Sequence, residues 1–204
     1  MTQIANGHNA QTREQRYQEM CKRVSTLTDT LGATIDSGIF ETVVVLNLLG
    51  LHTSQSCEGH LNHGYPYPWV TITDDERSRT FNRIWLSVCK LEEQAKTSKT
   101  VQAYDDYLST DIQLRTLVAK WDANDRVFEQ ITRLLDIFYA EQDMQTNSAR
   151  LLVKRFHPGT YRIEPGFSLA VKELPASLKA TYLARGQAEM QAFTAFLKKQ
   201  WQQS

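Results

Sequence analysis

Residues 51–73 read LHTSQSCEGHLNHGYPYPWVTIT, and this stretch decides the fold class because the pattern changes here from helices to strands. Residues 69–73 are all β-branched or aromatic, follow Pro68 and precede two aspartates, which predicts a strand. Residues 51–58 are rich in Thr and Ser and lack helical periodicity, which predicts a second strand. The segment between them, residues 59–68, holds two glycines and two prolines, so we expect a long hairpin or a functional loop.

The sequence on both sides of this stretch is mostly helical. Apolar residues recur every three or four positions over residues 12–31, and a second apolar run extends from Asp36 to Gly50. Further helices are predicted over residues 77–97, 122–144 and 175–201, with one or two shorter helices over residues 98–124. Gly186 weakens the last helix by roughly 1 kcal/mol relative to Ala, which leaves room for a break there. Residues 150–156 and 160–164 are predicted to be two short strands joined by a His-Pro-Gly turn.

This order of elements predicts an α+β fold. We expect a small antiparallel sheet of about four strands, packed with five or more helices. Residues 1–10 are polar and lack periodicity, so they are predicted to be disordered, and residues 11–204 to form a single α+β domain.

Composition excludes several classes of function. The chain of 204 residues carries 23 Lys and Arg against 23 Asp and Glu, so no nucleic-acid partner is expected from its overall charge. No stretch approaches the roughly 20 apolar residues of a membrane span, and the first residues lack the apolar core of a secretory signal. The three cysteines include no CxxC pair, so we expect no disulfide framework and a cytoplasmic location.

Reactive side chains gather in residues 52–63, which hold three of the five histidines and one of the three cysteines. Cys57, His60 and His63 follow a C-x2-H-x2-H spacing, and Cys and His are the usual ligands of zinc. A site for a divalent metal such as zinc is therefore one hypothesis.

Nucleophilic catalysis is a second hypothesis for the same loop. Cys57 stands at the end of a predicted strand, where a turn at Gly59 would expose its sulfur, and His60 would act as the base. The remaining candidates for binding a small-molecule ligand are Ser56, Glu58, Gly59, Tyr65 and Tyr67, the two tyrosines as a stacking surface.

Purely structural roles form a third hypothesis. A cysteine at a strand end is often a small buried hydrophobe, and the glycines and the Tyr-Pro-Tyr-Pro segment can serve only the turn. The protein would then be a non-catalytic interaction protein, for example a homodimer that buries the amphipathic helix over residues 175–201. For the loop as a whole we favour a functional role, because packing alone rarely collects so many reactive groups.

A basic group near the C-terminus also has two interpretations. It consists of Arg150, Lys154, Arg155, His157 and Arg162. It could bind an anion, or it could be the charged surface of an edge hairpin. Strand alternation distributes these residues over both faces, which favours the second interpretation.

Residues 36–69 resemble the N-terminal part of the tRNA wybutosine-synthesizing protein 3 family, in which an apolar helix leads into a strand ending in Thr-Ser-x-Ser-Cys-x-Gly-Arg. The matching residues are Thr53 to His60, with His60 in place of the arginine. The resemblance covers about a sixth of the chain and implies an α/β methyltransferase that uses S-adenosylmethionine on a modified guanosine of tRNA. The missing arginine and the neutral charge fit tRNA poorly, so we interpret the match as a shared strand and turn. The Ser-Cys-Glu-Gly-His signature also resembles that of a bacterial family, a likeness that implies no particular activity.

Overall fold

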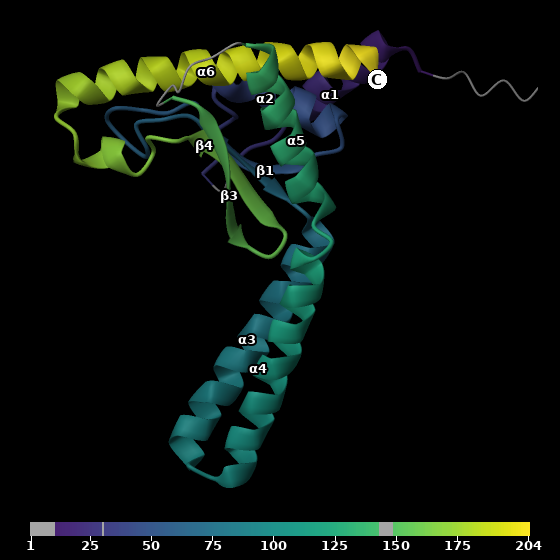
Figure 1. Ribbon diagram of the computed structural model, residues 1–204, viewed down its shortest axis with the longest axis vertical. Coiled ribbons are helices and arrows are strands. Elements are labelled where there is room, and N and C mark those ends of the chain that lie inside the picture. The colour runs from purple at the N-terminus through teal and green to yellow at the C-terminus, as the bar shows by residue number, and fades with distance from the viewer. Residues whose placement is uncertain (1–10, 30, 143–148) are drawn as a thin grey trace, which may run out of the picture.

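The computed structural model describes residues 11–29, 31–142 and 149–204, and within these ranges it has six α-helices and one four-stranded sheet (Figure 1). The helices are α1 (Arg13–Ser25), α2 (Ser37–Leu48), α3 (Asp75–Ser98), α4 (Val101–Asp122), α5 (Arg126–Glu141) and α6 (Ala176–Gln203), with a short 3-10 helix η1 (Ala170–Glu173) before α6. The strands are β1 (Thr53–Cys57), β2 (Trp69–Thr73), β3 (Leu151–His157) and β4 (Thr160–Pro165). The α+β prediction is confirmed. The disorder predicted for residues 1–10 lies outside the described residues.

The sheet is antiparallel throughout and has the strand order β1-β2-β4-β3. Cys57 of β1 pairs with Trp69 of β2, so the loop over residues 58–68 closes the end of the hairpin at which Cys57 lies. β1 and β3 are the edge strands. The reactive loop predicted from the sequence therefore stands at one corner of the sheet.

Helices α2, α5 and α6 cover one face of the sheet and enclose the main core. Val70, Ile72 and Ile163 of the sheet are buried against side chains such as Leu46, Phe138 and Phe193 of these helices. The long helix α6 crosses above the sheet in Figure 1. The C-terminal half of its apolar face is buried within the chain, at Met190, Phe193, Phe196, Leu197 and Trp201, whereas Leu178 near its start is 46% exposed.

The first helix ends earlier than its periodicity predicts. Helix α1 stops at Ser25, and Leu27 and Leu31 are 45% and 91% exposed. The Asp29 carboxylate accepts hydrogen bonds from the backbone N–H groups of Leu31 and Ala33, at 2.8 and 2.9 Å, and so stabilises a turn. Such local bonds compete with the helix and here outweigh its periodicity. The prediction of a helix to residue 31 is therefore wrong.

Two alternatives that the sequence left open are resolved in the helical regions. Residues 101–122 form one continuous helix, and α6 runs through Gly186 without a break. A Cβ atom at Gly186 would lie only 3.0–3.1 Å from Pro68, Phe167 and Pro165, so this glycine serves close packing of α6 against the loop and β4.

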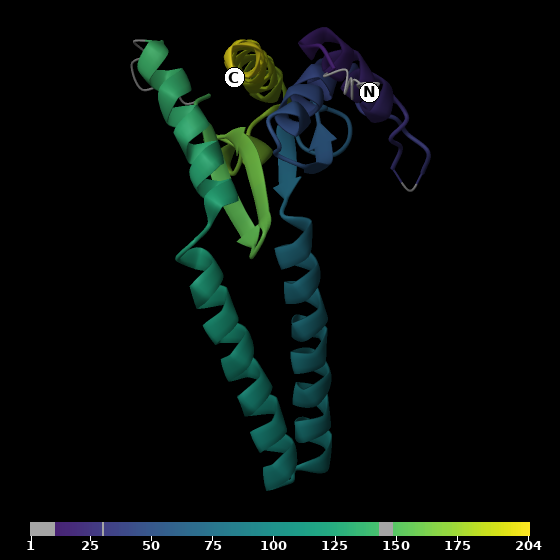
Figure 2. The same cartoon turned by 90° about the vertical axis from the view of Figure 1, so that its right-hand side faces the viewer.

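Helices α3 and α4 form a long hairpin that projects away from the rest of the molecule (Figures 1 and 2). Within the two helices only Ser78, Val88, Ala95 and Leu114 are buried. Among the described residues, none of those between 75 and 122 belongs to the three apolar clusters of the core. We call the molecule without this hairpin the body. No helix among the described residues is both long and apolar enough to cross a membrane.

Candidate functional site

The site lies in a cleft between the edge strand β1 and residues 27–29 and 33–36, which belong to the connection from α1 to α2. The cleft has a volume of about 470 Å³, within the range of small-molecule sites. All five residues of β1 line it, together with His60, His63, Gly64, Trp69, Val43 and residues 27–29 and 33–36. We call it the β1 cleft.

Three side chains of types that can ligate a metal ion meet at one end of this cleft. Asp36, Cys57 and His60 each offer a donor atom, and the three donors all lie within 4.8 Å of one another. The closest pair is Nε2 of His60 and Oδ2 of Asp36, 3.1 Å apart. All three residues are half-buried, so the cluster is held by the fold and still reached from the cleft.

The turn after β1 brings Cys57 and His60 together. Gly59 has φ +88°, a conformation that L residues with side chains rarely adopt. A Cβ atom there would also lie 2.6 Å from Cδ1 of Leu183 and 2.7 Å from the backbone carbon of Tyr67. The backbone N–H of Gly59 donates to Sγ of Cys57 over 3.3 Å. Glycine is therefore required here by conformation and by space.

The carboxylates of Asp36 and Glu58 each accept a hydrogen bond from the backbone of the other residue's segment. Asp36 stands at the N-cap position of α2, yet its carboxylate makes no capping bond to that helix. It accepts instead from the backbone N–H of Glu58 at 3.0 Å. The Glu58 carboxylate accepts from the backbone N–H of Gly38, in the first turn of α2, at 2.7 Å. These two hydrogen bonds fix the turn after β1 to the start of α2, so Glu58 acts as a positioning residue. Its side chain does not line the cleft.

Burial raises the pKa of the Cys57 thiol above its usual value, and the nearby charge of Asp36 raises it further. The hydrogen bond from the backbone N–H of Gly59 lowers this pKa, by less than burial raises it but by more than the charge of Asp36 does. The sulfur is therefore a protonated thiol at neutral pH, whereas a nucleophilic cysteine needs a lowered pKa.

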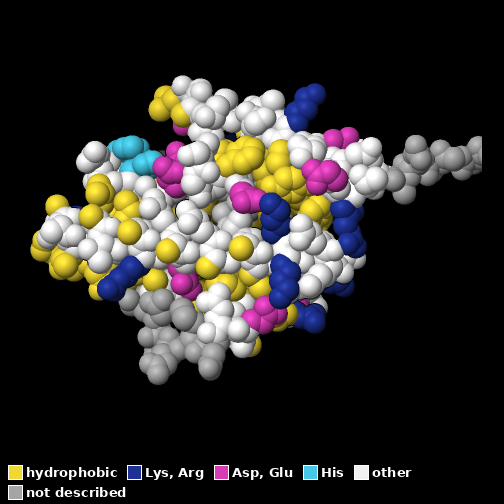
Figure 3. Space-filling view, turned by 90° about the horizontal axis from the view of Figure 1, so that it is seen from above, with side chains coloured by type: hydrophobic (Ala, Val, Ile, Leu, Met, Phe, Trp, Pro, Cys, Tyr) yellow, Lys and Arg dark blue, Asp and Glu magenta, His cyan; other side chains and the backbone are white. Residues whose placement is uncertain are grey.

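His63 lines the cleft beside the three donors without joining them. Its ring stacks on that of His60, with the centroids 4.2 Å apart and the planes 18° from parallel. In the space-filling view, histidine side chains lie at the surface next to acidic side chains (Figure 3). The structure thus unites two of the three metal ligands predicted from the sequence and holds the third alongside.

Tyr65 and Tyr67 are not in the cleft. Tyr67 is 3% exposed and belongs to a small apolar cluster with Phe167 and Val171. Tyr65 stacks on Tyr67 at 5.3 Å, and its ring lies 4.3 Å from the ammonium group of Lys172. The two tyrosines therefore pack the loop against the rest of the fold. Of the other predicted ligand-binding residues, only Ser56 lines the cleft.

Asp36 is the site residue that the sequence did not reveal. It lies 21 positions before Cys57 and matches the pattern of an ordinary helix N-cap. The one signal was its place at the start of the stretch that resembles another family.

The basic residues near the C-terminus have partners within the fold. Arg150 lies over the ring of Tyr139, Lys154 pairs with Glu164, Arg155 pairs with Asp122 and Asp125, and Arg162 lies over the rings of Trp69 and Phe156. His157 stacks on Phe81. This hairpin therefore serves packing, and its arrangement gives no support to an anion site.

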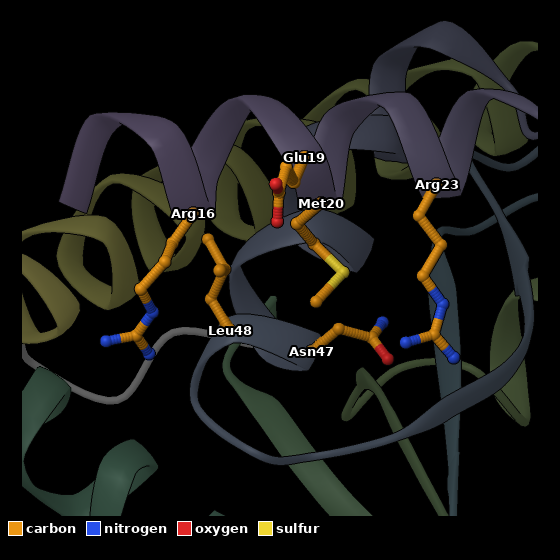
Figure 4. Close-up of a pocket in the computed structure, with 6 residues that line it drawn as sticks. All are labelled: Arg16, Glu19, Met20, Arg23, Asn47 and Leu48. Atoms are coloured by element: carbon orange, nitrogen blue, oxygen red, sulfur yellow. The ribbon is translucent and has the colours of Figure 1, made fainter. Parts of the chain in front are cut away.

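A second pocket, of about 400 Å³, lies between α1 and α2 (Figure 4). Its lining residues are Arg16, Glu19, Met20, Arg23, Asn47 and Leu48. Arg16 and Arg23 reach in from α1 at opposite ends, with Met20 between them. The side-chain amide of Asn47 is already bonded to α2 and β1. This lining offers no nucleophile and no histidine, so the β1 cleft is the better candidate for chemistry.

No protein-family model, curated protein or solved structure matches this chain.

Proposed function

We propose that this protein binds a divalent transition-metal ion, zinc above others, through Asp36, Cys57 and His60. The observation that carries the proposal is the convergence of three donors from two segments on one end of a cleft. A thiolate, an imidazole and a carboxylate are ligands that zinc uses, and the sulfur disfavours magnesium and calcium.

The spacing of the donors supports a tetrahedral site. Zinc binds nitrogen and oxygen at about 2.0–2.2 Å and sulfur at about 2.3 Å, so its ligand atoms lie about 3.4–3.6 Å apart. The donors of Asp36, Cys57 and His60 lie within 4.8 Å of one another, and one pair is 3.1 Å apart. These separations are close to those that a tetrahedral zinc ion requires.

Three protein ligands beside an open cleft are the arrangement of catalytic zinc sites, in which water or substrate takes the fourth position. The β1 cleft provides about 470 Å³ for such a ligand. We therefore favour a metal centre that takes a small molecule at its open position. The raised pKa of Cys57 counts against a free nucleophile, and a metal ion would have to displace the thiol proton to bind.

The test is a zinc titration of the metal-stripped protein in competition with a chromogenic chelator. We expect one ion per chain. Cys57→Ser, His60→Gln and Asp36→Asn should each weaken binding by more than about 100-fold, because even outer-sphere partners are worth about 10–100-fold. Cys89→Ser is the matched control, since Cys89 is also a half-buried free cysteine but lies on α3.

Two further measurements define the coordination. Cobalt in place of zinc should give a thiolate-to-cobalt absorption band that Cys57→Ser removes and Cys89→Ser retains. His63→Gln should weaken binding by less than about tenfold if the fourth position is open, and as much as His60→Gln if His63 closes it. Failure to bind one ion, or equal binding by wild type and Cys57→Ser, would refute the proposal.

A further inference from the structure

The outer face of α4 carries a regular stripe that the described part of the chain leaves uncovered. Its members are Val101, Asp105, Leu108, Ile112, Arg115 and Ala119, at alternating intervals of four and three residues. All six are exposed, and the apolar ones include Val101 at 79%, Leu108 at 49% and Ile112 at 61%. We call these six residues the α4 stripe.

This stripe is distinct from the face that packs on α3. Within the hairpin, α4 turns Tyr107, Leu114 and Leu117 inward, and these are buried or half-buried. The α4 stripe lies on the opposite side of the helix, since its residues are offset by about half a turn from that face. Alternating intervals of four and three are the repeat of helices that pack along a partner helix.

Two copies of the α4 stripe are complementary to each other when the helices run antiparallel. Two antiparallel copies aligned about Thr110 place Leu108 opposite Ile112 at the centre, on both sides of the symmetry axis. Asp105 then faces Arg115, and Val101 faces Ala119 at the ends. Opposite charges flanking an apolar centre fix the register and direction of paired helices.

We infer that two copies of this chain associate through antiparallel pairing of their α4 helices. The hairpin projects from the body, so two hairpins can lie side by side with the two bodies at opposite ends (Figures 1 and 2). Arg115 already bonds Asp111 of its own helix, with Nε 2.6 Å from Oδ2, and this bond holds the guanidinium beside the stripe. The charge complementarity is the reason for choosing a second copy over an unrelated partner.

The interface is small, so the affinity of the dimer should be low. A helix of 22 residues is about 33 Å long, and one stripe of six residues buries less than the roughly 1,200 Å² of stable complexes. The dimer should therefore form in the micromolar range and depend on concentration. Salt should weaken it, because the two Asp105–Arg115 pairs would be partly exposed.

Sedimentation equilibrium of the full chain tests this inference, over concentrations from low to several hundred micromolar. The wild type should change from 23.4 kDa towards twice that mass. Leu108→Asp and Ile112→Asp should each raise the dissociation constant at least about tenfold, because central contacts dominate an interface. Leu86→Asp on α3 is the matched control, since Leu86 is 68% exposed but outside the stripe.

Charge reversal tests the direction of pairing independently. Asp105→Arg and Arg115→Asp should each weaken the dimer several-fold, and the chain with both changes should recover most of the loss. These exposed substitutions are expected to leave the circular dichroism spectrum unchanged. A wild type that stays monomeric overturns the inference, as does a dimer that neither the apolar variants nor the reversals affect.

Discussion

Gly59 controls the geometry of the candidate metal site at the scale of a single residue. It has φ +88°, and a Cβ atom there would lie 2.6–2.7 Å from Leu183 and the backbone of Tyr67. Gly59→Ala should therefore lower the free energy of unfolding and weaken zinc binding together, because the turn also positions Cys57 and His60. Urea denaturation and the zinc titration measure the two effects.

Gly50→Ala is the control for this change. Gly50 has a similar φ of +80° but no atom within 4 Å of the Cβ position, so it tests backbone strain alone. That strain costs about 1–2 kcal/mol, and the added clash at Gly59 should cost about 1–3 kcal/mol more. Equal losses for the two variants would show that the space around Gly59 adapts without cost.

Tyr67 gives a pH-dependent prediction at the same scale. Burial raises its pKa to about 12, whereas an unfolded tyrosine ionises near pH 10. The folded state thus favours the neutral phenol, so this contribution to stability is complete below about pH 10 and is lost as pH rises towards 12. Tyr67→Phe should therefore lose less free energy of unfolding between about pH 9 and about pH 11 than the wild type does. Parallel losses in urea denaturation would contradict this assignment.

Part of the site could be predicted from neighbouring residues. Cys57 and His60 lie three positions apart, so local spacing was enough to group them. Asp36 joins them only because α2 begins beside the turn after β1, a contact set by the tertiary fold. A single sequence reports spacing along the chain, and it does not report which distant segment reaches the same point.

Glu58 shows at the scale of an element how the site and α2 depend on each other. Its carboxylate accepts from the backbone N–H of Gly38 at 2.7 Å and so caps a helix that Asp36 leaves uncapped. Glu58→Ala should lower the free energy of unfolding by about 1 kcal/mol, as loss of a helix cap does. Glu93→Ala, an exposed change on α3, should cost less than about 0.5 kcal/mol in the same thermal denaturation series. If both variants melt alike, Glu58 has no capping role.

The elements themselves were largely predictable, and their exceptions have local causes. β2 follows the prediction residue for residue, because its β-branched and aromatic side chains stand between a proline and two aspartates. The periodicity over residues 12–31 failed where the Asp29 carboxylate offered the backbone an alternative turn. The helix predicted over residues 175–201 continues through Gly186, because the missing side chain of this residue lets Pro68 and Phe167 pack against α6. In the last case tertiary packing outweighed helix propensity.

At the scale of the whole molecule, the hairpin and the body have separate apolar packing. The α3–α4 hairpin contributes no described residue to the apolar clusters of the core, so the body does not need it for burial. Arg77 joins the two ends of the hairpin, donating to the backbone oxygen of Asn124 at 2.7 Å and of Trp121 at 3.3 Å. These hydrogen bonds therefore already join the two helices of the hairpin where the hairpin meets the body.

This arrangement predicts that the outer hairpin can be removed without loss of the site. Replacement of residues 82–117 by a short glycine-rich turn keeps Arg77 and Phe81 and removes Leu108 and Ile112 from the chain. The shortened protein should fold with a similar melting temperature and bind zinc within about threefold of the wild type, because distant changes are nearly independent. It should also remain monomeric at every concentration in sedimentation equilibrium. Loss of zinc binding in a folded, shortened protein would mean that the hairpin supports the site, and persistence of the dimer would place the interface on the body.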